Sequence, residues 1–473
     1  MNSGIIRKIT ATVFALAFTV IPFIARAQDA PPPVAGQGGG LMTVDEAGYL
    51  HMDMGQAVAY SLGQNQTLQS SVEQALAAES GRRSSLGAFG PALSTSYGFQ
   101  RNRPISGVAR DDNLYTWTIS VEQAVFTGFR LISQYQRAAL QRDYYDASRF
   151  NTELSLIATV QQNFLSLLAA RENVTSAQDS LTRLQDQLRV TTAFYEVGLR
   201  PRLDVLQAQV DASEAENVLI QAQNMLETQQ ARMNTLLNLP VEAPIVYVGS
   251  LDYIPFDATL EQCLSTAYRL RPDITMASKN TEIAQQEKRM AASNFYPQIS
   301  ALFEYSRVGD TPRVQGSDYY TGTRDHDWRV WVGANWSLFN WGTDYFAVEQ
   351  ARHMVSSMIA QENALNEEVA YEIKSRLLKI GEARKRIKVA QYGLTQAHEA
   401  YRVALARYEA QVGTNTDLLD AQSKLSAAEA SLTSAQADYL TALAVLYQSM
   451  GVANPTLDVA LSPQSVNGQP VQP

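Results

Sequence analysis

Hydrophobic positions near the end of the chain recur at alternating steps of three and four residues. The series is Leu418, Ala421, Leu425, Ala428, Leu432, Ala435, Tyr439, Ala442 and Leu446. This spacing is the a/d seam of a coiled coil, sustained for about four heptads. The first half of the chain has a matching series, Val205, Ala208, Ala212, Ala215, Leu219, Ala222, Leu226, Gln229 and Met233. Because large residues alternate with alanine, both seams predict closely packed helices.

Each seam follows an even longer stretch with helical character, at residues 129–197 and 344–410. At 1.5 Å per residue, such a helix would reach about 100 Å, which no ordinary globular core requires. Taken alone, this pattern also fits a structural periplasmic coiled-coil protein without a pore.

Four segments alternate instead with a period of two residues, at 93–100, 115–122, 298–306 and 327–338. Leu302 is an apolar exception on the otherwise polar side of the third segment. Each segment is about as long as a tilted strand that crosses a bilayer, and the alternation is typical of transmembrane barrels. A soluble hairpin with one buried face is the alternative.

All five tryptophans, at positions 117, 328, 331, 336 and 341, lie in or beside these strands. Indole rings favour the membrane–water interface because they are amphipathic. We therefore expect Trp117, Trp328 and Trp336 to be interface aromatics in contact with membrane lipid.

Four strands cannot close a barrel by themselves, because an open edge in lipid leaves backbone groups unpaired. Two copies would supply eight strands and three copies twelve. Side chains fill the interior of an eight-stranded barrel, so an open conduit favours three copies. The sequence therefore predicts an obligate oligomer and favours three copies, whose strands would form a trimeric, twelve-stranded barrel.

The chain also repeats itself about 210 residues apart. Asp204 follows Tyr195 by nine residues, Asp417 follows Tyr408 by nine residues, and an Ala-Gln pair closes each block. So long a period predicts one large motif built twice. The expected fold is mostly α with a small β part, in which each half holds a short helix, a hairpin and two long antiparallel helices.

The duplication divides the chain into segments. We expect repeat one at residues 54–240, a connection at 241–258 and repeat two at 259–451. Residues 28–53 read as a flexible segment, because proline and glycine are frequent in residues 28–42. Residues 452–473 read as a disordered tail, because they carry several proline, glutamine and serine residues. Residues 1–27 carry Arg7 and Lys8, an apolar run and a small-residue end, which predicts a signal peptide.

Composition removes several classes of function. The formal net charge is −9, and without a basic face a nucleic-acid partner is not expected. One cysteine allows no intrachain disulfide. The four histidines are scattered without zinc-binding spacing, and we find no nucleophile–base set. We therefore expect no enzyme activity, metal or cofactor.

This arrangement resembles the TolC family of outer-membrane efflux and secretion channels over residues 54–451. The segments that carry the resemblance are 270–273 (Leu-Arg-Pro-Asp), 295–298 (Phe-Tyr-Pro-Gln), 339–342, 195–209 and 408–422. The resemblance implies a homotrimer in the outer membrane of a Gram-negative bacterium, with a twelve-helix periplasmic tunnel. It also implies partners, namely a periplasmic adaptor and an inner-membrane pump of the RND or ABC type that supplies the energy.

The duplicated blocks are helix–turn–helix segments, in which Gly198 and Gly413 suit chain reversal. The resemblance implies that these turns are periplasmic tips that contact the adaptor. The tip residues are Val197, Gly198, Leu199, Gln411, Val412 and Gly413. The second tip departs from the family pattern, since Gln411 stands where glycine is usual. A solvated turn is the alternative.

Asp417 and Asp420 are three residues apart and can share one helix face. The resemblance implies an acidic entrance ring, which three copies would build from six carboxylates, and crowding should raise some of their pKa values. Placement near a helix N-terminus is the simpler alternative.

The resemblance also implies a gate. Asp204 and Tyr408 match a hydrogen-bonded pair that holds the family's entrance closed. Gly413 stands where the family's second latch has arginine, so we hypothesise that Arg200 and Arg202 replace it by pairing with Asp417 or Asp420.

The leading interpretation is a passive exit duct for drugs in a tripartite efflux system. A type I protein-secretion channel is the alternative within the family.

Overall fold

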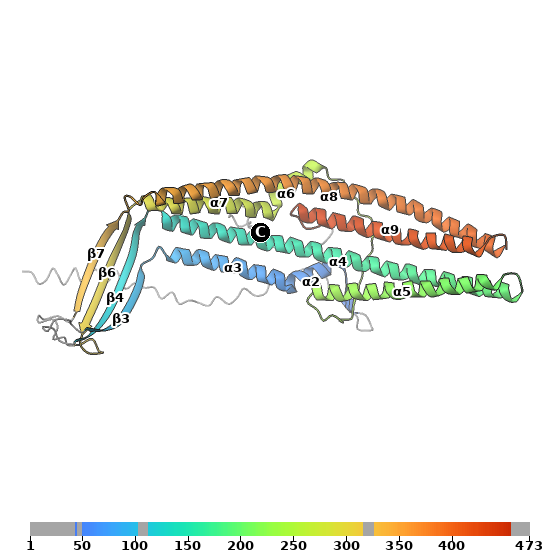
Figure 1. The fold of residues 1–473 in the computed structure, drawn as a ribbon, viewed down its shortest axis with the longest axis horizontal. Coiled ribbons are helices and arrows are strands. Elements are labelled where there is room, and N and C mark those ends of the chain that lie inside the picture. Colours follow the sequence, from blue (N-terminus) through green and yellow to red (C-terminus); the bar gives the residue numbers. More distant parts are fainter. Residues whose placement is uncertain (1–42, 45–49, 103–111, 316–325, 456–473) are drawn as a thin grey trace, which may run out of the picture.

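The computed structural model describes residues 43–44, 50–102, 112–315 and 326–455 and shows an elongated molecule with strands at one end (Figure 1). The expected signal peptide and most of the two terminal tails lie outside the described residues. The described part begins with α2 (Met54–Gln64) and α3 (Gln66–Gly87). The second half has the equivalent α6 (Leu260–Leu270) and α7 (Pro272–Ala292), followed by the short η1 (Ser293–Phe295).

Two helices therefore precede each hairpin, where the sequence suggested one. In the first half the chain bends at Asn65, whose side-chain oxygen accepts hydrogen bonds from the backbone N–H groups of Thr67 and Leu68. In the second half Arg271 is extended, and Pro272 occupies the first turn of α7. Extended backbone is favoured before proline, so the break follows from the local sequence.

Four long helices form the body of the molecule. They are α4 (Arg130–Glu196) and α8 (Thr343–Glu409), each of 67 residues, and α5 (Arg202–Leu236) and α9 (Asn415–Ser449), each of 35 residues. The bounds of α4 and α8 lie within one residue of the predicted segments, and the two predicted seams fall within α5 and α9. No helix in the described ranges is both long and apolar enough to span a membrane.

The helices are arranged around α4. It packs against α3 and α5 on one side and against α7 and α9 on the other, and α8 covers α7 and α9 (Figure 1). The body core lies midway along these helices, where Phe164 and Leu168 of α4, Ile373 of α8 and Tyr439 and Leu443 of α9 are buried. In this order, α3 and α5 form one edge of the helical layer and α8 forms the other.

A four-stranded antiparallel sheet stands at one end of the molecule. Its strands β3 (Ala92–Asn102), β4 (Asp112–Thr127), β6 (Gln298–Gly309) and β7 (His326–Asn335) are ordered β3-β4-β6-β7. The two hairpins thus join through β4 and β6, and β3 and β7 are the sheet edges. Trp336 lies beyond the end of β7, so the predicted fourth strand was too long.

The strand register gathers polar residues on one face of this sheet. Ser120 on β4 pairs with Ser94 on β3 and with Glu304 on β6, and Glu304 pairs with Arg329 on β7. Neighbouring positions face the other way because a strand has a period of two. The opposite face carries Leu93, Val121, Phe303 and Val330, among others.

A second, smaller sheet joins the segment before repeat one to the connection between the repeats. It consists of β1 (Thr43–Val44), β2 (Leu50–Met52) and β5 (Ile245–Tyr247) in the order β1-β2-β5. Met52 is completely buried, and the Asp53 side chain accepts a hydrogen bond from the backbone N–H of Gln56. The expectation that residues 28–53 are flexible is therefore wrong for residues 50–53.

Candidate functional site

The turn between α4 and α5 forms the first tip, at the end of the body far from the strands (Figure 1). Gly198 has a φ of 77°, and its N–H donates a hydrogen bond to the carbonyl of Tyr195. Glycine adopts this left-handed conformation without steric cost. The apolar side chains of Val197 and Leu199 are exposed on this tip.

The turn between α8 and α9 forms the second tip with different chemistry. Gln411, and not Gly413, takes the left-handed conformation, with a φ of 65°. Gly413 is needed for another reason, since a Cβ there would lie 3.1 Å from the backbone nitrogen of Tyr408. The role expected for Gly413 in chain reversal is thus performed by Gln411. Val412 is exposed at this tip.

Tyr408 is the central buried side chain behind the second tip, with 1% of its surface exposed. Its hydroxyl lies 2.6 Å from the hydroxyl of Thr191 on α4. The guanidinium of Arg200 lies over its ring, with 4.9 Å between Cζ and the ring centroid. The same arginine donates a 2.7 Å hydrogen bond from Nη2 to the carbonyl of Gly413.

These contacts correct the expected pairing of Tyr408 with Asp204. Asp204 lies in the first turn of α5, and its carboxylate is 3.9 Å from Nη1 of Arg200, which precedes this helix. Arg200 therefore bridges both repeats through Tyr408 and Gly413, whereas Asp204 stays within repeat one. The partner of the Tyr408 hydroxyl is Thr191, which sequence reasoning missed.

Further polar contacts join α4 to α9 above the tip. Nε2 of Gln187 donates a 2.6 Å hydrogen bond to Oδ1 of Asn415, and both residues are buried. Gln187 and Thr191 continue the row of Leu181 and Leu184 along one side of α4. Polar residues that interrupt an apolar helix face are the sequence signal that could have revealed this contact.

Asp417 completes the capping box of α9, whose N-cap residue is Thr414. Its backbone N–H donates to the hydroxyl of Thr414, and its carboxylate accepts from the backbone N–H of Thr414. The Thr414 side chain and backbone lower the pKa of Asp417, and the positive charge of Arg407 adds to this effect. The expected rise of the pKa is therefore not found within one chain.

Asp420 forms an ion pair with Lys424, with 2.7 Å between Oδ2 and Nζ. Among the ion pairs of the described residues, none joins Arg200 or Arg202 to Asp417 or Asp420. The hypothesis that these arginines pair with the two aspartates is therefore wrong for the single chain.

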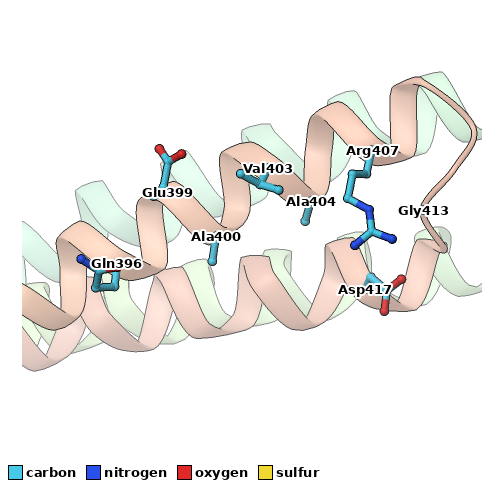
Figure 2. Close-up of a pocket in the computed structure, with 8 residues that line it drawn as sticks. All are labelled: Gln396, Glu399, Ala400, Val403, Ala404, Arg407, Gly413 and Asp417. Atoms are coloured by element: carbon cyan, nitrogen blue, oxygen red, sulfur yellow. The ribbon is translucent and has the colours of Figure 1, made fainter.

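A groove of about 410 Å³ runs between α8 and α9 beside the second tip (Figure 2). Its lining residues are Gln396, Glu399, Ala400, Val403, Ala404, Arg407, Gly413 and Asp417. Figure 2 shows the Arg407 side chain extending toward Asp417 across the groove. The small side chains of Ala400 and Ala404 leave room for this groove. Arg407 and Asp417 line its end beside the tip.

The expected interface tryptophans lie toward both ends of the sheet. Trp117 on β4 donates from Nε1 to Thr95 at 3.0 Å, and it meets Tyr305 edge to face. Trp328 pairs with Tyr305 in the register and is exposed near the hairpin end. Trp336 lies at the helix end and donates from Nε1 to the carbonyl of Phe295 at 3.2 Å.

The chain was compared with known proteins and structures. The family described as "Outer membrane efflux protein" matches residues 57–239 and 263–452, which is most of each repeat. The probable efflux pump outer membrane protein TtgC of Pseudomonas putida is 22% identical over 310 residues, 65% of this chain and 62% of that protein. The outer membrane efflux protein BepC of Brucella suis is 21% identical over 72% of each chain.

The fold is also found among solved structures. A membrane protein from Pseudomonas aeruginosa superposes with a TM-score of 0.76 at 18% identity, over 85% of this chain and 90% of that one. The matched segment spans 62% of the length of TtgC, which is less than two thirds. Two family matches, one in each half, confirm the internal duplication. The chain therefore belongs to the outer membrane efflux protein family, the TolC-like channels of the bacterial outer membrane, which are not enzymes.

Proposed function

We propose that three copies of this chain form a passive exit duct in the outer membrane for small molecules delivered by an efflux pump. The observation that carries the proposal is an open four-stranded sheet, polar on one face, continued by helices of 67 residues. TtgC and BepC, which are similar to this chain, are both described as outer-membrane efflux proteins. Transport of drugs or solvents by this chain is our extension of that similarity.

The sheet edges support the trimer. Among the described strands, β3 pairs only with β4, and β7 pairs only with β6. Each outer edge would leave its backbone groups unpaired in lipid, at a cost of several kcal/mol per group. Pairing of β7 with β3 of the next copy removes both edges, and three copies give twelve strands. The polar face would then line the lumen and the apolar face would contact lipid.

The edges of the helical layer support the same assembly. On α8, Tyr371, Leu378 and Val389 are exposed, although they are large and apolar. On α5, Leu203, Leu206 and Val210 are exposed at steps of three and four residues. Extended apolar stripes of this kind mark contact surfaces. In the proposed trimer, α8 of one copy packs against α3 and α5 of the next.

The proposed gate is at the tips. Tyr408, Thr191 and Arg200 hold the second tip against α4, and separation of the repeats must break these contacts. Asp204 takes part only through Arg200. These hydrogen bonds can be replaced by bonds to water when the tip opens. They therefore favour the closed tip by only a small net free energy. Arg202 has no part in this gate.

The proposed entrance ring contains Asp417 and Asp420 from each copy. Arg407 and Lys424 offset part of their charge, so the ring attracts cations less strongly than six bare carboxylates would. The periplasmic adaptor is proposed to bind at the tips and in the groove of Figure 2. The tips offer it the exposed apolar side chains of Val197, Leu199 and Val412.

Currents through the protein in planar lipid bilayers test this function. We expect discrete single-channel currents that prefer cations, with lower preference when Asp417 and Asp420 are both changed to Asn. In the source organism, deletion of the gene should lower tolerance to several unrelated drugs. Loss of one secreted protein with unchanged drug tolerance would favour type I secretion instead. Absence of current would contradict a pore of any kind.

A further inference from the structure

Two of the apolar side chains on the polar face of the four-stranded sheet are direct neighbours in the register. Leu302 on β6 is the direct partner of Trp331 on β7. The next pair on the same face is Glu304 with Arg329, which form an ion pair of 2.9 Å. Leu302 and Trp331 therefore form an apolar pair within a polar surface, and the proposed function gives them no role.

The indole of Trp331 lies along its own strand. A Cβ at Gly333 would overlap the six-membered ring of Trp331, so the ring covers the bare backbone of that glycine. Residues two apart in a strand share a face, and the ring is thus held on the polar side. Half of the Trp331 surface is nevertheless exposed. Trp328, three residues earlier, lies on the apolar face instead.

Negative charge surrounds this apolar pair. Glu122 on β4 is the register partner of Leu302 on its other side, and its side chain is exposed. Asp327 lies on the same face, two residues before Arg329, and is also exposed. Together with Glu304, three carboxylates face one guanidinium in this part of the sheet. A cation is therefore favoured near the indole.

We propose that Trp331, Leu302 and Glu122 form a transit site for aromatic organic cations on the inner wall of the barrel. This inference rests on the proposed function, because only a closed barrel places the polar face in the lumen. The π face of tryptophan attracts a cation through its quadrupole. Leu302 contacts the apolar part of the cargo, and Glu122 provides the opposite charge.

The site is suited to brief contact. Exposed cation–π contacts contribute little free energy, so a bound cation leaves quickly. Gly333 helps because it lets the indole lie flat along the wall and leaves the lumen open. Larger binding energy would trap the cargo and slow a passive duct.

Block of the channel by benzyltriethylammonium tests the site. The full-length protein is reconstituted in a planar bilayer, and the cation is added on the side of the strand hairpins. We expect Trp331→Ala to require roughly twofold to fivefold more blocker for half-maximal reduction of the potassium current. Trp331→Phe should stay close to the unaltered protein. Trp328→Ala is the matched control on the other face and should not change the block.

A second variant keeps the test independent of the tryptophan. Glu122→Gln should raise the half-blocking concentration about twofold to threefold without changing the potassium current by more than that factor. Equal block of the unaltered protein, Trp331→Ala and Glu122→Gln would overturn this inference and leave the proposed duct intact. Absence of current in every variant would overturn the proposed function and the transit site together.

Discussion

The middle of the helical body and its tip use the same helices with different chemistry. In the middle, α4, α8 and α9 share one core of buried apolar side chains, such as Phe164, Ile373 and Tyr439. Behind the tip, α4 contacts them through Gln187 and Thr191, which form hydrogen bonds. Apolar burial is lost when surfaces separate, whereas hydrogen bonds can be replaced by bonds to water. The difference suggests a rigid body with a tip that opens.

The largest expected effect comes from breaking the middle of the body. Phe164→Ala removes a completely buried ring and should destabilise the protein by about 3–5 kcal/mol. Urea unfolding followed by helical circular dichroism measures this loss. Leu168→Met conserves volume in the same core and should cost less than about 1.5 kcal/mol. If Phe164→Ala instead opened the channel with unchanged stability, the body would not be the rigid region.

A smaller effect is expected from the tip. Tyr408→Phe leaves the buried Thr191 hydroxyl without its partner, at about 1–3 kcal/mol. This cost falls on the closed state, so single-channel recordings should show open probability raised by about tenfold. Thr191→Val should act alike, and the double variant should add little.

The matched control for this prediction is Tyr401→Phe, seven residues earlier on α8. The Tyr401 hydroxyl makes no hydrogen bond within the described residues. Its removal should therefore leave the open probability unchanged. Equal behaviour of the two tyrosine variants would show that the contact with Thr191 does not hold the gate.

The two arginines beside the first tip sharpen the comparison further. Arg200→Lys keeps the charge but loses the planar contact with Tyr408, worth about 0.5–1 kcal/mol. We expect a rise in open probability of about twofold to fivefold in the same recordings. Arg202→Lys should have no effect. A larger effect at Arg202 would restore the hypothesis that it pairs across the entrance.

The smallest effect concerns the cap of α9. The pKa of Asp417 is lowered in the folded protein, so ionised Asp417 stabilises the tip above its ordinary pKa of about 3.9. This stabilisation is lost as the pH falls through the lowered, folded pKa. Hydrogen exchange at the start of α9 should be faster in Asp417→Asn than in the unaltered protein at pH 6. Persistence of the difference once Asp417 is protonated in the folded protein would contradict a role for the charge.

The sequence predicted the long helices and the main strands because their periods extend over many residues. It missed β2 and β5, since three residues are too few to show a period. It also predicted one helix before each hairpin, although Asn65 and Arg271 each separate two helices. A bend of one residue hardly disturbs the helical spacing of apolar positions.

The site was predicted less completely than the fold. Tyr408 was identified, but its partner was not, because the choice between Asp204 and Thr191 depends on how α4 and α8 are offset. Gln187 and Thr191, four positions apart on α4, are polar residues in an otherwise apolar row. This interruption could have predicted a polar contact behind the tip. The positive φ of Gln411 was hidden because glycine, the usual residue for this conformation, lies two residues later.

The central claim is that one copy supplies a third of a closed wall. Native mass spectrometry of the detergent-extracted protein tests it most directly, since the mass counts the chains in each particle. The account predicts three chains, each smaller than the 52.2 kDa of the full sequence if the leader is removed. A water-soluble particle of one chain would contradict it.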